Sequence, residues 1–466
     1  MTGKLIFFFD FRVSASTKDL MTMRNVGLYW FGNDLRVHDN ANLLKAACEV
    51  NDLLCIYCVD PQWLLPNRYG LATLSANRWR FLKESLLDLD KQLHQLGQHL
   101  LVCYEAPVKA ISDLTSEHKV SLIYRSRQTG YYENQQWLAL RKQLPLVQFV
   151  EADTHSLYAL DQLPFPLAKL PDTFTQFKNA VEYLPVDMPL PPADFLPSSP
   201  VPKRDWLGNS PDYLKLTSES EQEIVFHGGE KAGLKQLTDY FATDCASHYK
   251  ERRNELDGWE NSSKFSPWLA NGNLSVRQIC FNLNHYEQKA GANESTYWLF
   301  FELLWRDYFQ WYAHRHGKHL FAFQGIKQQK PLTSFYPERF GKWCRGNTPY
   351  PLVNGCMKQL NATGFMSNRG RQIAASCLVN ELAVDWRYGA AYFEQQLLDY
   401  DVASNWGNWQ YLAGVGADPR GKRHFDLDKQ TRQYDPEGRF INKWQGRIQN
   451  LPLDSVDAAD WPLVAG

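Results

Sequence analysis

The sequence has 466 residues, which predicts two or three domains at the usual size of roughly 100–200 residues each. Hydrophobic residues make up 44%, aromatic residues 14% and charged residues 22%, a composition that excludes a disulfide scaffold or a disordered chain. The formal net charge is −1, so a nucleic acid would have to bind to a local basic surface. The nine cysteines, an odd number, fit reduced thiols of a cytoplasmic protein better than disulfides or a metal site.

The first 23 residues precede the first convincing strand. Their apolar run, Leu5–Phe9, is closed by Asp10 and is too short for the core of a signal peptide or for a membrane span. Because Met21 and Met23 lie just before the strand, we interpret residues 1–23 as a leader or an over-long translational start. We expect a cytoplasmic protein that does not contact a membrane.

An α/β domain is expected at residues 24–158. Short apolar runs predict five strands, at 26–31, 53–59, 99–105, 121–126 and 146–151. They alternate with helical segments, and the clearest of these is 76–96, where leucines recur at spacings of three and four. Apolar strands separated by helices predict a doubly wound parallel five-stranded sheet. No G-x-G-x-x-G motif follows the first strand, which argues against an ordinary dinucleotide-binding domain.

Residues 159–212 are expected to form a connector, and residues 213–466 an all-helical domain. Prolines concentrate in the connector, where their missing backbone N–H groups prevent helices from propagating. The helices expected beyond the connector lie at 233–253, 275–289, 296–314, 368–386 and 388–398.

Two segments of the helical domain bring polar groups together. The turn Asn261–Pro267 contains three hydroxyl groups and a cation, which suit a pyrophosphate or a ribose, although such turns are also ordinary helix caps. Further on, Glu302, Trp305 and Arg306 are spaced to share one helical face, as they would on any amphipathic helix.

Two later segments add positive charge and a pair of carboxylates. Residues 339–371 carry six Lys or Arg and no acidic residue, interleaved with aromatic side chains, which fits either a phosphodiester backbone or a merely solvated surface. Within 399–411, Asp399 and Asp401 can accept hydrogen bonds from a ring N–H group and from Arg371. Hydrolysis by this pair is disfavoured, because no nucleophile or second base accompanies it.

The order of these motifs resembles the photolyase and cryptochrome family. The resemblance begins with Trp30–Arg36 and Asp39–Asn40 and continues through the four segments, so that it covers residues 25–446. It implies an N-terminal α/β antenna domain, a long connector, and a helical C-terminal domain that binds FAD in a bent conformation.

The resemblance implies a set of FAD-binding residues. Arg371 and Asp399 would pair beside the flavin ring, and Asp401 would accept from the flavin or its ribose. Asn405 would face flavin N5, where a neutral amide can rotate to suit either protonation state, whereas a carboxylate would repel a reduced anionic ring. The full implied set is Tyr249, Ser262, Ser263, Lys264, Phe265, Ser266, Arg306, Asn368, Arg371, Asp399, Asp401 and Asn405.

The resemblance also implies a substrate. Family members that repair the six-four photoproduct carry a His where this chain has Asn368, so a cyclobutane pyrimidine dimer is expected. Glu302 would hydrogen-bond a carbonyl group of the dimer and stabilise its radical anion, and Trp305 would stack on the dimer. The residues expected to contact nucleic acid are Arg253, Arg345, Arg369, Gln372 and Tyr411.

Two departures resemble the cryptochrome DASH subgroup. Gln372 and Tyr411 stand where ordinary dimer photolyases have Met and Trp. The loss of apolar pocket wall weakens dimer binding, and an unpaired strand removes the cost of flipping a dimer out of a duplex. We therefore expect repair mainly in single-stranded DNA.

Electron supply and light harvesting follow from the same resemblance. Trp409 and Trp386 match the inner two members of the family's electron-transfer chain, although Trp386 also fits simple core packing. At the position of the family's third, surface-exposed Trp this chain has Thr333, so we expect Tyr336, or a shifted Trp343, to take the place of that Trp. The expected antenna is 5,10-methenyltetrahydrofolate, bound between the domains by Glu133, which also fits a plain helix-start carboxylate.

Two other functions remain open. A blue-light photoreceptor would use the same flavin to signal through a partner, but only residues 445–466 follow Trp444, which favours the enzyme. RNA binding or storage through the basic segment is the third possibility. We expect the protein to act as a monomer.

Overall fold

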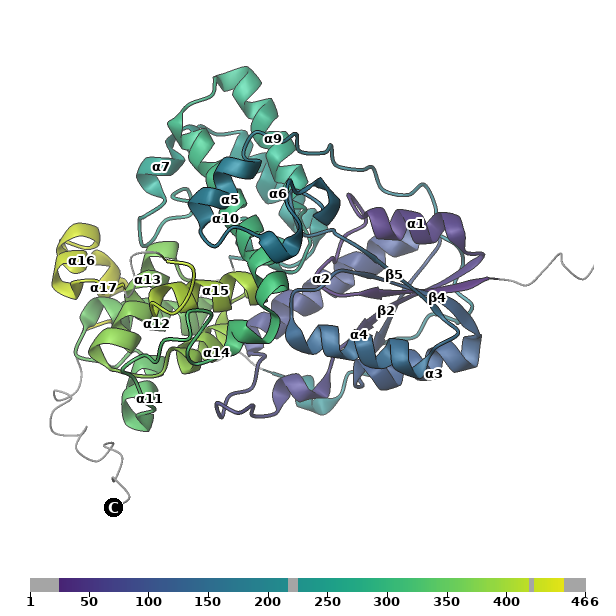
Figure 1. Cartoon of the computed structure of the whole chain (residues 1–466), viewed down its shortest axis with the longest axis horizontal. Coiled ribbons are helices and arrows are strands. Elements are labelled where there is room, and N and C mark those ends of the chain that lie inside the picture. Colours follow the sequence, from purple (N-terminus) through teal and green to yellow (C-terminus); the bar gives the residue numbers. More distant parts are fainter. Residues whose placement is uncertain (1–24, 217–224, 419–422, 448–466) are drawn as a thin grey trace, which may run out of the picture.

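The computed structural model describes residues 25–216, 225–418 and 423–447. An α/β part and a helical part lie side by side (Figure 1). The expected leader, residues 1–23, lies outside the described residues.

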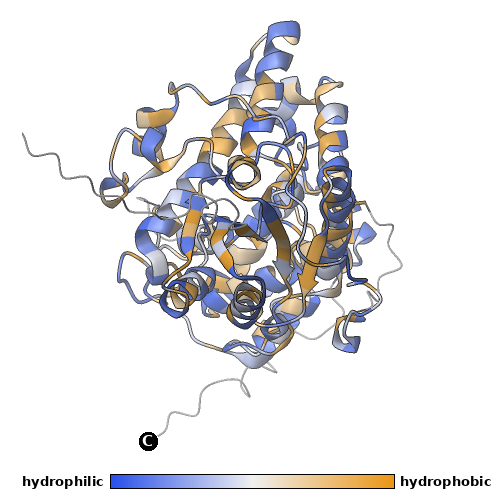
Figure 2. Cartoon of the chain, turned by 90° about the vertical axis from the view of Figure 1, so that its right-hand side faces the viewer, coloured by the Kyte–Doolittle hydropathy of each residue, from blue (hydrophilic) through white to orange (hydrophobic). Residues whose placement is uncertain are grey.

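A five-stranded parallel sheet forms the core of the α/β part, as the sequence predicts. Its strands are β1 (Val26–Phe31), β2 (Asp52–Cys58), β3 (Leu100–Cys103), β4 (Val120–Ser126) and β5 (Gln148–Ala152), in the order β3-β2-β1-β4-β5. Every residue of β1 and β2 is buried, because helices cover both faces of the sheet. The strands are largely orange in Figure 2, whereas the helices around them alternate between orange and blue.

The helices that cover the sheet are α1 (Ala41–Glu49), α2 (Ala76–Gln95), α3 (Pro107–His118) and α4 (Tyr131–Gln143). Apolar side chains of α1 and α2 share one core cluster with the sheet, and those of α3 and α4 share the cluster on the opposite face. The predicted doubly wound arrangement is therefore confirmed. Helix α2 begins at its N-cap Ser75, which accepts from the backbone N–H of Arg78, and is followed by Gly97 at φ +80°.

The chain between the sheet and the long helices contains one helix that the sequence pattern did not predict. This helix, α5 (Phe174–Val181), buries Phe174, Phe177 and Val181 in the core of the helical part. Its eight residues are too few for a clear periodic signal. The segment therefore contributes to the core of the helical part, in addition to connecting the two parts of the molecule.

The remaining helices form the helical part. They are α6 (Glu230–Phe241), α7 (Tyr249–Arg252), α8 (Ser266–Ala270), α9 (Val276–Ala290), α10 (Glu294–His316), α11 (Pro337–Arg345), α12 (Pro351–Thr363), α13 (Asn368–Ser376), α14 (Trp386–Gln396), α15 (Val402–Leu412), α16 (Leu427–Tyr434) and α17 (Arg439–Lys443). Figure 1 shows α10 in the middle of the helical part, between α9 and α15.

Two predicted helices are interrupted. The expected helix at 233–253 breaks after Phe241, where the Thr243 hydroxyl donates to the Tyr240 carbonyl and accepts from the Cys245 N–H, replacing helical bonds. The expected helix at 368–386 gives way at Cys377 to a π-helical turn, and Ala383 then adopts φ +51°. Trp386 consequently begins a new helix, α14.

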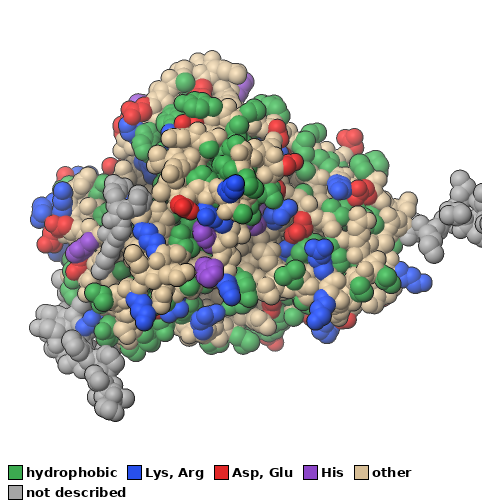
Figure 3. Space-filling view, viewed as in Figure 1, with side chains coloured by type: hydrophobic (Ala, Val, Ile, Leu, Met, Phe, Trp, Pro, Cys, Tyr) green, Lys and Arg blue, Asp and Glu red, His purple; other side chains and the backbone are tan. Residues whose placement is uncertain are grey.

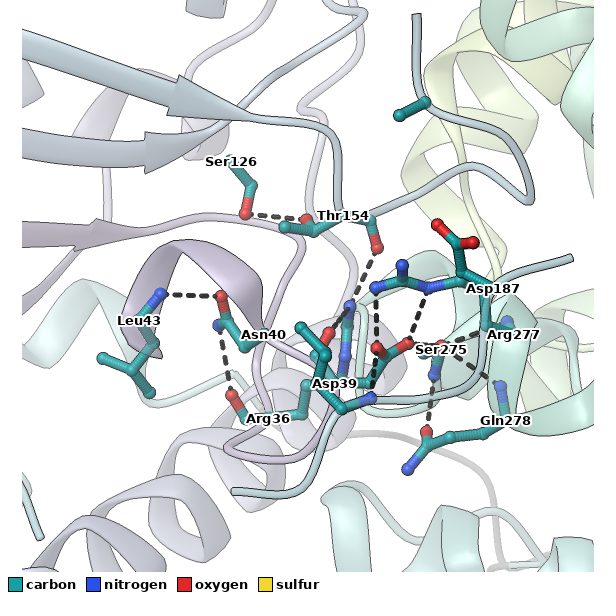
Figure 4. A network of polar contacts seen from close by, with 12 residues as sticks. Arg36, Asp39, Asn40, Leu43, Ser126, Thr154, Asp187, Ser275, Arg277 and Gln278 are labelled. Atoms are coloured by element: carbon teal, nitrogen blue, oxygen red, sulfur yellow. Dashed lines mark hydrogen bonds and ion pairs between the residues drawn. The ribbon is translucent and has the colours of Figure 1, made fainter. Parts of the chain in front are cut away.

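Buried polar contacts join the two parts of the molecule (Figure 4). The Asp39 carboxylate accepts from Arg277 at 2.6 Å and 3.1 Å, from the Leu190 N–H at 3.0 Å, and from the Ser275 hydroxyl. Arg36 donates to the carbonyl oxygens of Gly272, at 3.0 Å, and Thr154, at 2.8 Å. The motif around Arg36 and Asp39 is thus an interdomain clasp.

Among the described residues, no helix is long and apolar enough to cross a membrane.

Candidate functional site

A cavity of about 280 Å³ opens in the helical part. Its wall combines the turn after α7 with residues of α7, α10, α13, α14 and α15. Most of the residues expected to bind the cofactor or the substrate line it together, although they are far apart in the sequence. They are Tyr249, Arg253, Ser262, Ser263, Lys264, Phe265, Ser266, Glu302, Asn368, Arg371, Gln372, Asp399, Asp401, Asn405 and Trp409.

The turn before α8 presents an unusual lysine to the cavity. Lys264 is only 9% exposed, its backbone has φ +56°, and its ammonium group lies 5.1 Å from the centre of the Phe365 ring. Burial lowers the pKa of Lys264 to about 8. The turn is held from outside by Gln236, which donates to the Ser263 carbonyl at 3.0 Å. A buried cation in this position favours an anionic ligand.

An ion pair lies on another part of the wall. Arg371 donates to Asp399 Oδ2 at 2.7 Å and to the Met366 carbonyl at 2.9 Å, so the predicted pair exists. The other carboxylate oxygen, Asp399 Oδ1, is buried and makes no hydrogen bond to any described residue. An orphaned acceptor of this kind points to a ligand that supplies an N–H or O–H donor.

Asp401 and Asn405 are both held by protein groups. Asp401 is the N-cap of α15, where it accepts from the Ser404 N–H at 2.7 Å, and it also accepts from Gln310 at 3.0 Å and 2.9 Å. Asn405 donates through Nδ2 to the Ala390 carbonyl at 3.0 Å. This bond uses one of the two N–H donors of Asn405, and no hydrogen bond to its carbonyl oxygen is found among the described residues, so that oxygen can meet a ligand. The sequence reasoning missed the capping role of Asp401.

Glu302 pairs with a cation at the cavity. Its Oε1 lies 2.5 Å from Arg253 Nη1, and both residues line the cavity. Burial raises the pKa of Glu302, and the neighbouring Arg253 opposes this rise. Burial also raises the pKa of the Tyr249 phenol close by. The site therefore holds a carboxyl group whose proton affinity is increased, next to a guanidinium group.

Trp305, Arg306 and Tyr411 do not line the cavity. Trp305 stacks on Phe174 with ring centroids 3.7 Å apart, and the Arg306 guanidinium donates to the His155 carbonyl. The expected shared face of Glu302, Trp305 and Arg306 is thus divided, because α5 and the residues after β5 cover part of α10. Tyr411 meets Trp305 edge-on at 6.1 Å, and its hydroxyl accepts from Arg423.

The positive charges between residues 339 and 371 do not form one surface. Lys342 is 4% exposed, Arg371 lies in the cavity, and Arg345 is exposed at the end of α11. The prediction of one basic and aromatic surface is therefore wrong, because helix packing turns these side chains in different directions. Figure 3 likewise shows Lys and Arg side chains spread over one face of the molecule.

Two residues expected to contact nucleic acid are bonded to each other. Arg369 donates to Gln372 Oε1 at 2.9 Å and to Asn254 Oδ1 at 3.0 Å. Its guanidinium also lies 5.0 Å from the centre of the Tyr434 ring. Gln372 thereby gives the cavity a polar wall that a neighbouring arginine holds in place.

The aromatic residues expected to carry electrons occupy different environments. Trp409 lines the cavity and is 2% exposed, and Trp386 is fully buried with its indole N–H on the Phe323 carbonyl at 3.0 Å. Trp343 is also fully buried. Tyr336 is half-buried and has the Arg339 guanidinium 4.5 Å from the centre of its ring.

Glu133 lies outside the cavity, in the first turn of α4. It is half-buried, and burial raises the pKa of its carboxyl group. Its backbone carbonyl accepts from Arg125 at 2.8 Å. The position is thus a helix start, as one interpretation of the sequence held, but the side chain is not fully exposed.

Several wall residues escaped the sequence reasoning. Phe365, Met366 and Ser367 precede α13, and Tyr400 and Asn408 stand inside the segment already noted for its Asp pair. The N-cap role of Ser367, which accepts from the Gly370 N–H at 3.1 Å, was a usable signal, because a serine directly before a helix is a typical cap. No group of three or more His, Cys, Asp or Glu that could hold a metal ion occurs in the part of the chain that the structure describes.

A parallel α/β sheet joined to a helical part, with a cavity lined by polar side chains and Trp409, is the architecture of photolyase-type flavoproteins. Two family models agree: one for DNA photolyase matches residues 27–194, and one for the FAD binding domain of DNA photolyase matches residues 298–463. The chain is 51% identical to a cryptochrome DASH of Idiomarina loihiensis, over 95% of this chain and 98% of that protein. The chain belongs to the photolyase and cryptochrome family, in its cryptochrome DASH group.

Solved structures give the same result. A cryptochrome of Synechocystis sp. has a TM-score of 0.86 and 39% identity, covering 94% of this chain and 92% of that one. An archaeal photolyase of Sulfolobus tokodaii, solved with two FAD molecules, has a TM-score of 0.73 and 28% identity, with 95% of each chain covered.

The residues of the cavity fit FAD. Lys264 supplies a buried cation for a diphosphate, and the orphaned Asp399 Oδ1 supplies an acceptor for a ring N–H group. Asn405 offers a carbonyl oxygen on the same wall. These three groups match the anionic and hydrogen-bonding ends of the cofactor.

Proposed function

We propose that the protein is a light-driven lyase that splits cyclobutane pyrimidine dimers, preferentially in single-stranded DNA. When bound, FAD would supply the light-dependent one-electron chemistry. The observation that carries the proposal is the half-buried pair of Glu302 and Arg253 on the wall of a cavity that fits FAD. A hydrogen-bonding carboxyl group beside a cation suits a pyrimidine carbonyl that gains negative charge.

The wall residues have separate tasks in this proposal. Lys264 and the hydroxyl groups of the turn at 262–266 hold the diphosphate and ribose. Arg371 and Asp399 orient the flavin ring as a pair, and the Asn405 carbonyl oxygen accepts from a protonated N5 position. Asp401 acts by fixing the start of α15 and hence the position of Asn405.

The substrate would lie between Glu302 and Asn368. Burial raises the pKa of Glu302 and Arg253 opposes the rise. A carboxyl group that carries a proton can donate to a dimer carbonyl and keep this bond as negative charge develops on the dimer. Trp305 and Tyr411 do not line the cavity, because Trp305 stacks on Phe174 and Tyr411 meets the edge of Trp305, so Glu302 is the proposed contact to the dimer.

The preference for single strands follows from the polar character of Gln372. Its amide is bonded to Arg369, so the wall offers little apolar surface to a dimer that must first leave a duplex. Flipping costs a few kcal/mol, and an unpaired strand largely avoids this cost. Arg253, which lines the cavity, and Arg369, which holds Gln372, are the proposed contacts to the DNA backbone.

The direct test is light-dependent repair by variants. We expect Glu302→Ala to lower the rate of dimer loss about 10- to 150-fold, because a hydrogen bond to a group that becomes charged is worth about 1.5–3 kcal/mol. The FAD content should stay close to that of the wild type. Equal repair rates in the variant and the wild type would refute the role of Glu302.

We also propose an antenna, 5,10-methenyltetrahydrofolate, with Glu133 as a contact to its pterin. The half-buried Glu133 carboxyl, with its raised pKa, suits the N–H groups of a pterin. Near-ultraviolet absorption that disappears in Glu133→Ala, while flavin absorption persists, supports this assignment. Unchanged near-ultraviolet absorption in the variant would reject it.

The competing function is a blue-light photoreceptor with little repair activity, which the name cryptochrome carried by the relatives favours. A holoprotein that responds to light but leaves irradiated single-stranded oligonucleotides unrepaired would decide for it. Tight binding to undamaged RNA would favour the RNA-binding alternative. We propose that the active form is a cytoplasmic monomer, which gel filtration of the FAD-loaded protein tests.

A further inference from the structure

An aromatic path leads from the buried Trp386 to the surface by way of Trp406, and the cavity residue Trp409 packs against the helix that carries Trp386. The Trp409 ring rests on α14 so closely that a side chain at Gly389 would come within 2.2 Å of it. Trp386, one turn earlier on α14, lies 5.8 Å from Trp406 between ring centroids. Trp386 and Trp406 are 0% and 3% exposed, so this part of the path is sealed from water.

The path continues beyond Trp406 through two tyrosines. Tyr69, in the loop before α2, lies 6.3 Å from Trp406 and 5.1 Å from Tyr388. Tyr388 in turn stacks on Phe335 at 4.0 Å, and Phe335 is 38% exposed. Both tyrosines are half-buried. The rings therefore form an unbroken series from the buried indoles to solvent.

We propose that Tyr69 and Tyr388 are the surface end of the electron path to FAD, with Trp406 linking them to Trp386. With FAD bound, oxidised and excited by light, one electron would leave this tyrosine pair and pass to the cofactor through Trp406, Trp386 and Trp409. The phenolic proton passes to water, and a soluble thiol later returns one electron and one proton to the tyrosine. The inference rests on the proposed function only for the presence of FAD.

The residues expected from the sequence are less suitable as the surface end. Trp343 is fully buried and has no access to solvent. The Arg339 guanidinium lies over the Tyr336 ring and disfavours removal of an electron from it, because the positive charge is attracted to the electron density of the ring. Tyr69 and Tyr388 are half-buried and pack edge to face. The Arg68 guanidinium lies 5.9 Å from the centre of the Tyr69 ring, farther than Arg339 lies from Tyr336.

The test is anaerobic blue-light reduction of the oxidised FAD-loaded protein with a thiol, followed by electron paramagnetic resonance. We expect the wild type to show a tyrosyl radical and the double variant Tyr69→Phe/Tyr388→Phe to lose it, because phenylalanine keeps the ring but has no phenol. Photoreduction should slow about tenfold, which corresponds to about 1.4 kcal/mol in barrier height. Trp406→Phe should slow it to a similar degree, and Tyr183→Phe, at an exposed position, should behave as the wild type.

Two results would overturn the inference. One is a tyrosyl radical that persists in the double variant, and the other is a radical that disappears in Tyr336→Phe alone. FAD content and thermal melting of each variant show whether a slower reaction reflects loss of the cofactor or of the fold. If dithionite-reduced wild-type protein fails to split dimers but the tyrosyl radical forms, the proposed function fails and the electron path is supported.

Discussion

The interdomain clasp and the cavity both contain buried charges, but they differ in how completely those charges are satisfied. At the clasp, the fully buried Asp39 accepts from Arg277, Ser275 and a backbone N–H group, and both of its oxygens are used. At the cavity, Asp399 keeps one buried oxygen without a partner among the described residues. The saturated carboxylate of Asp39 helps to hold the two parts together, whereas the unsaturated oxygen of Asp399, which faces the cavity, marks the place of a ligand.

The largest effect is expected at the clasp. Asp39→Ala should lower the free energy of unfolding by about 3–5 kcal/mol, because it leaves Arg277 as a buried charge without its partner. Urea denaturation of the apoprotein measures this change. Asp113→Ala, which removes an exposed partner of Lys109, is the matched control and should cost about 1 kcal/mol or less. Equal losses of unfolding free energy in the two variants would show that the clasp stabilises the protein no more than an exposed ion pair does.

The next effect concerns the unsaturated carboxylate. Asp399→Asn should weaken FAD binding by about 1.5–3 kcal/mol, or roughly 10- to 150-fold, because it removes a charged acceptor from the flavin. Its effect on the stability of the apoprotein should be much smaller than that of Asp39→Ala. Fluorescence titration with FAD measures the affinity, and Asp239→Asn on the surface of α6 is the control. If Asp399→Asn bound FAD as tightly as the wild type, the unpaired oxygen of Asp399 would not mark the FAD site.

A pH dependence is expected from Lys264. Burial lowers its pKa from 10.5 to about 8, so between these values the unfolded chain binds more protons at this residue than the folded apoprotein does. The stability of the apoprotein therefore rises with pH across this window. A bound diphosphate favours the ammonium form, so FAD binding takes up a proton above pH 8, and affinity falls by at most about tenfold per pH unit.

Calorimetric titration in buffers of different ionisation enthalpy detects the proton uptake. Lys264→Met should remove both the uptake and the fall in affinity, and Lys231→Met on the exposed start of α6 should change neither. A variant Lys264→Met that keeps the full pH dependence would place the titrating group elsewhere.

The smallest effect is expected at the polar wall. Gln372→Met replaces an amide bonded to Arg369 by apolar surface, which should favour dimer binding by about 1 kcal/mol, or roughly fivefold. The gain should be seen on duplex DNA, where dimer flipping makes binding limiting. The ratio of repair rates on duplex and single-stranded oligonucleotides measures it. An unchanged ratio means that Gln372 does not set the preference.

The sequence predicted those strands and helices whose formation depends on the local pattern of apolar residues. β1 and β2 were predictable because continuous apolar runs between helices typify buried parallel strands, and α2 because its leucines repeat with helical spacing. The end of the helix after Phe241 was not predictable, because it depends on hydrogen bonds between the Thr243 hydroxyl and the backbone of neighbouring residues.

The sequence predicted many of the residues that line the site, but it did not predict which residues they contact. The order of the motifs implied Lys264, Arg371 and Asp399 before any distance was known. Spacing on α10 suggested that Trp305 and Arg306 share the cavity with Glu302, but packing of α5 against Trp305 takes that face away. Helical spacing shows which residues share a face, whereas the neighbour that covers the face comes from distant sequence.

The most direct test of the account is the loss of cyclobutane dimers from ultraviolet-irradiated oligonucleotides incubated with reduced, FAD-loaded protein under blue light and in the dark. The account predicts light-dependent loss that is faster on single strands than on duplex of the same sequence. Dimers that persist in the light on single strands, despite a full complement of reduced FAD, would contradict it.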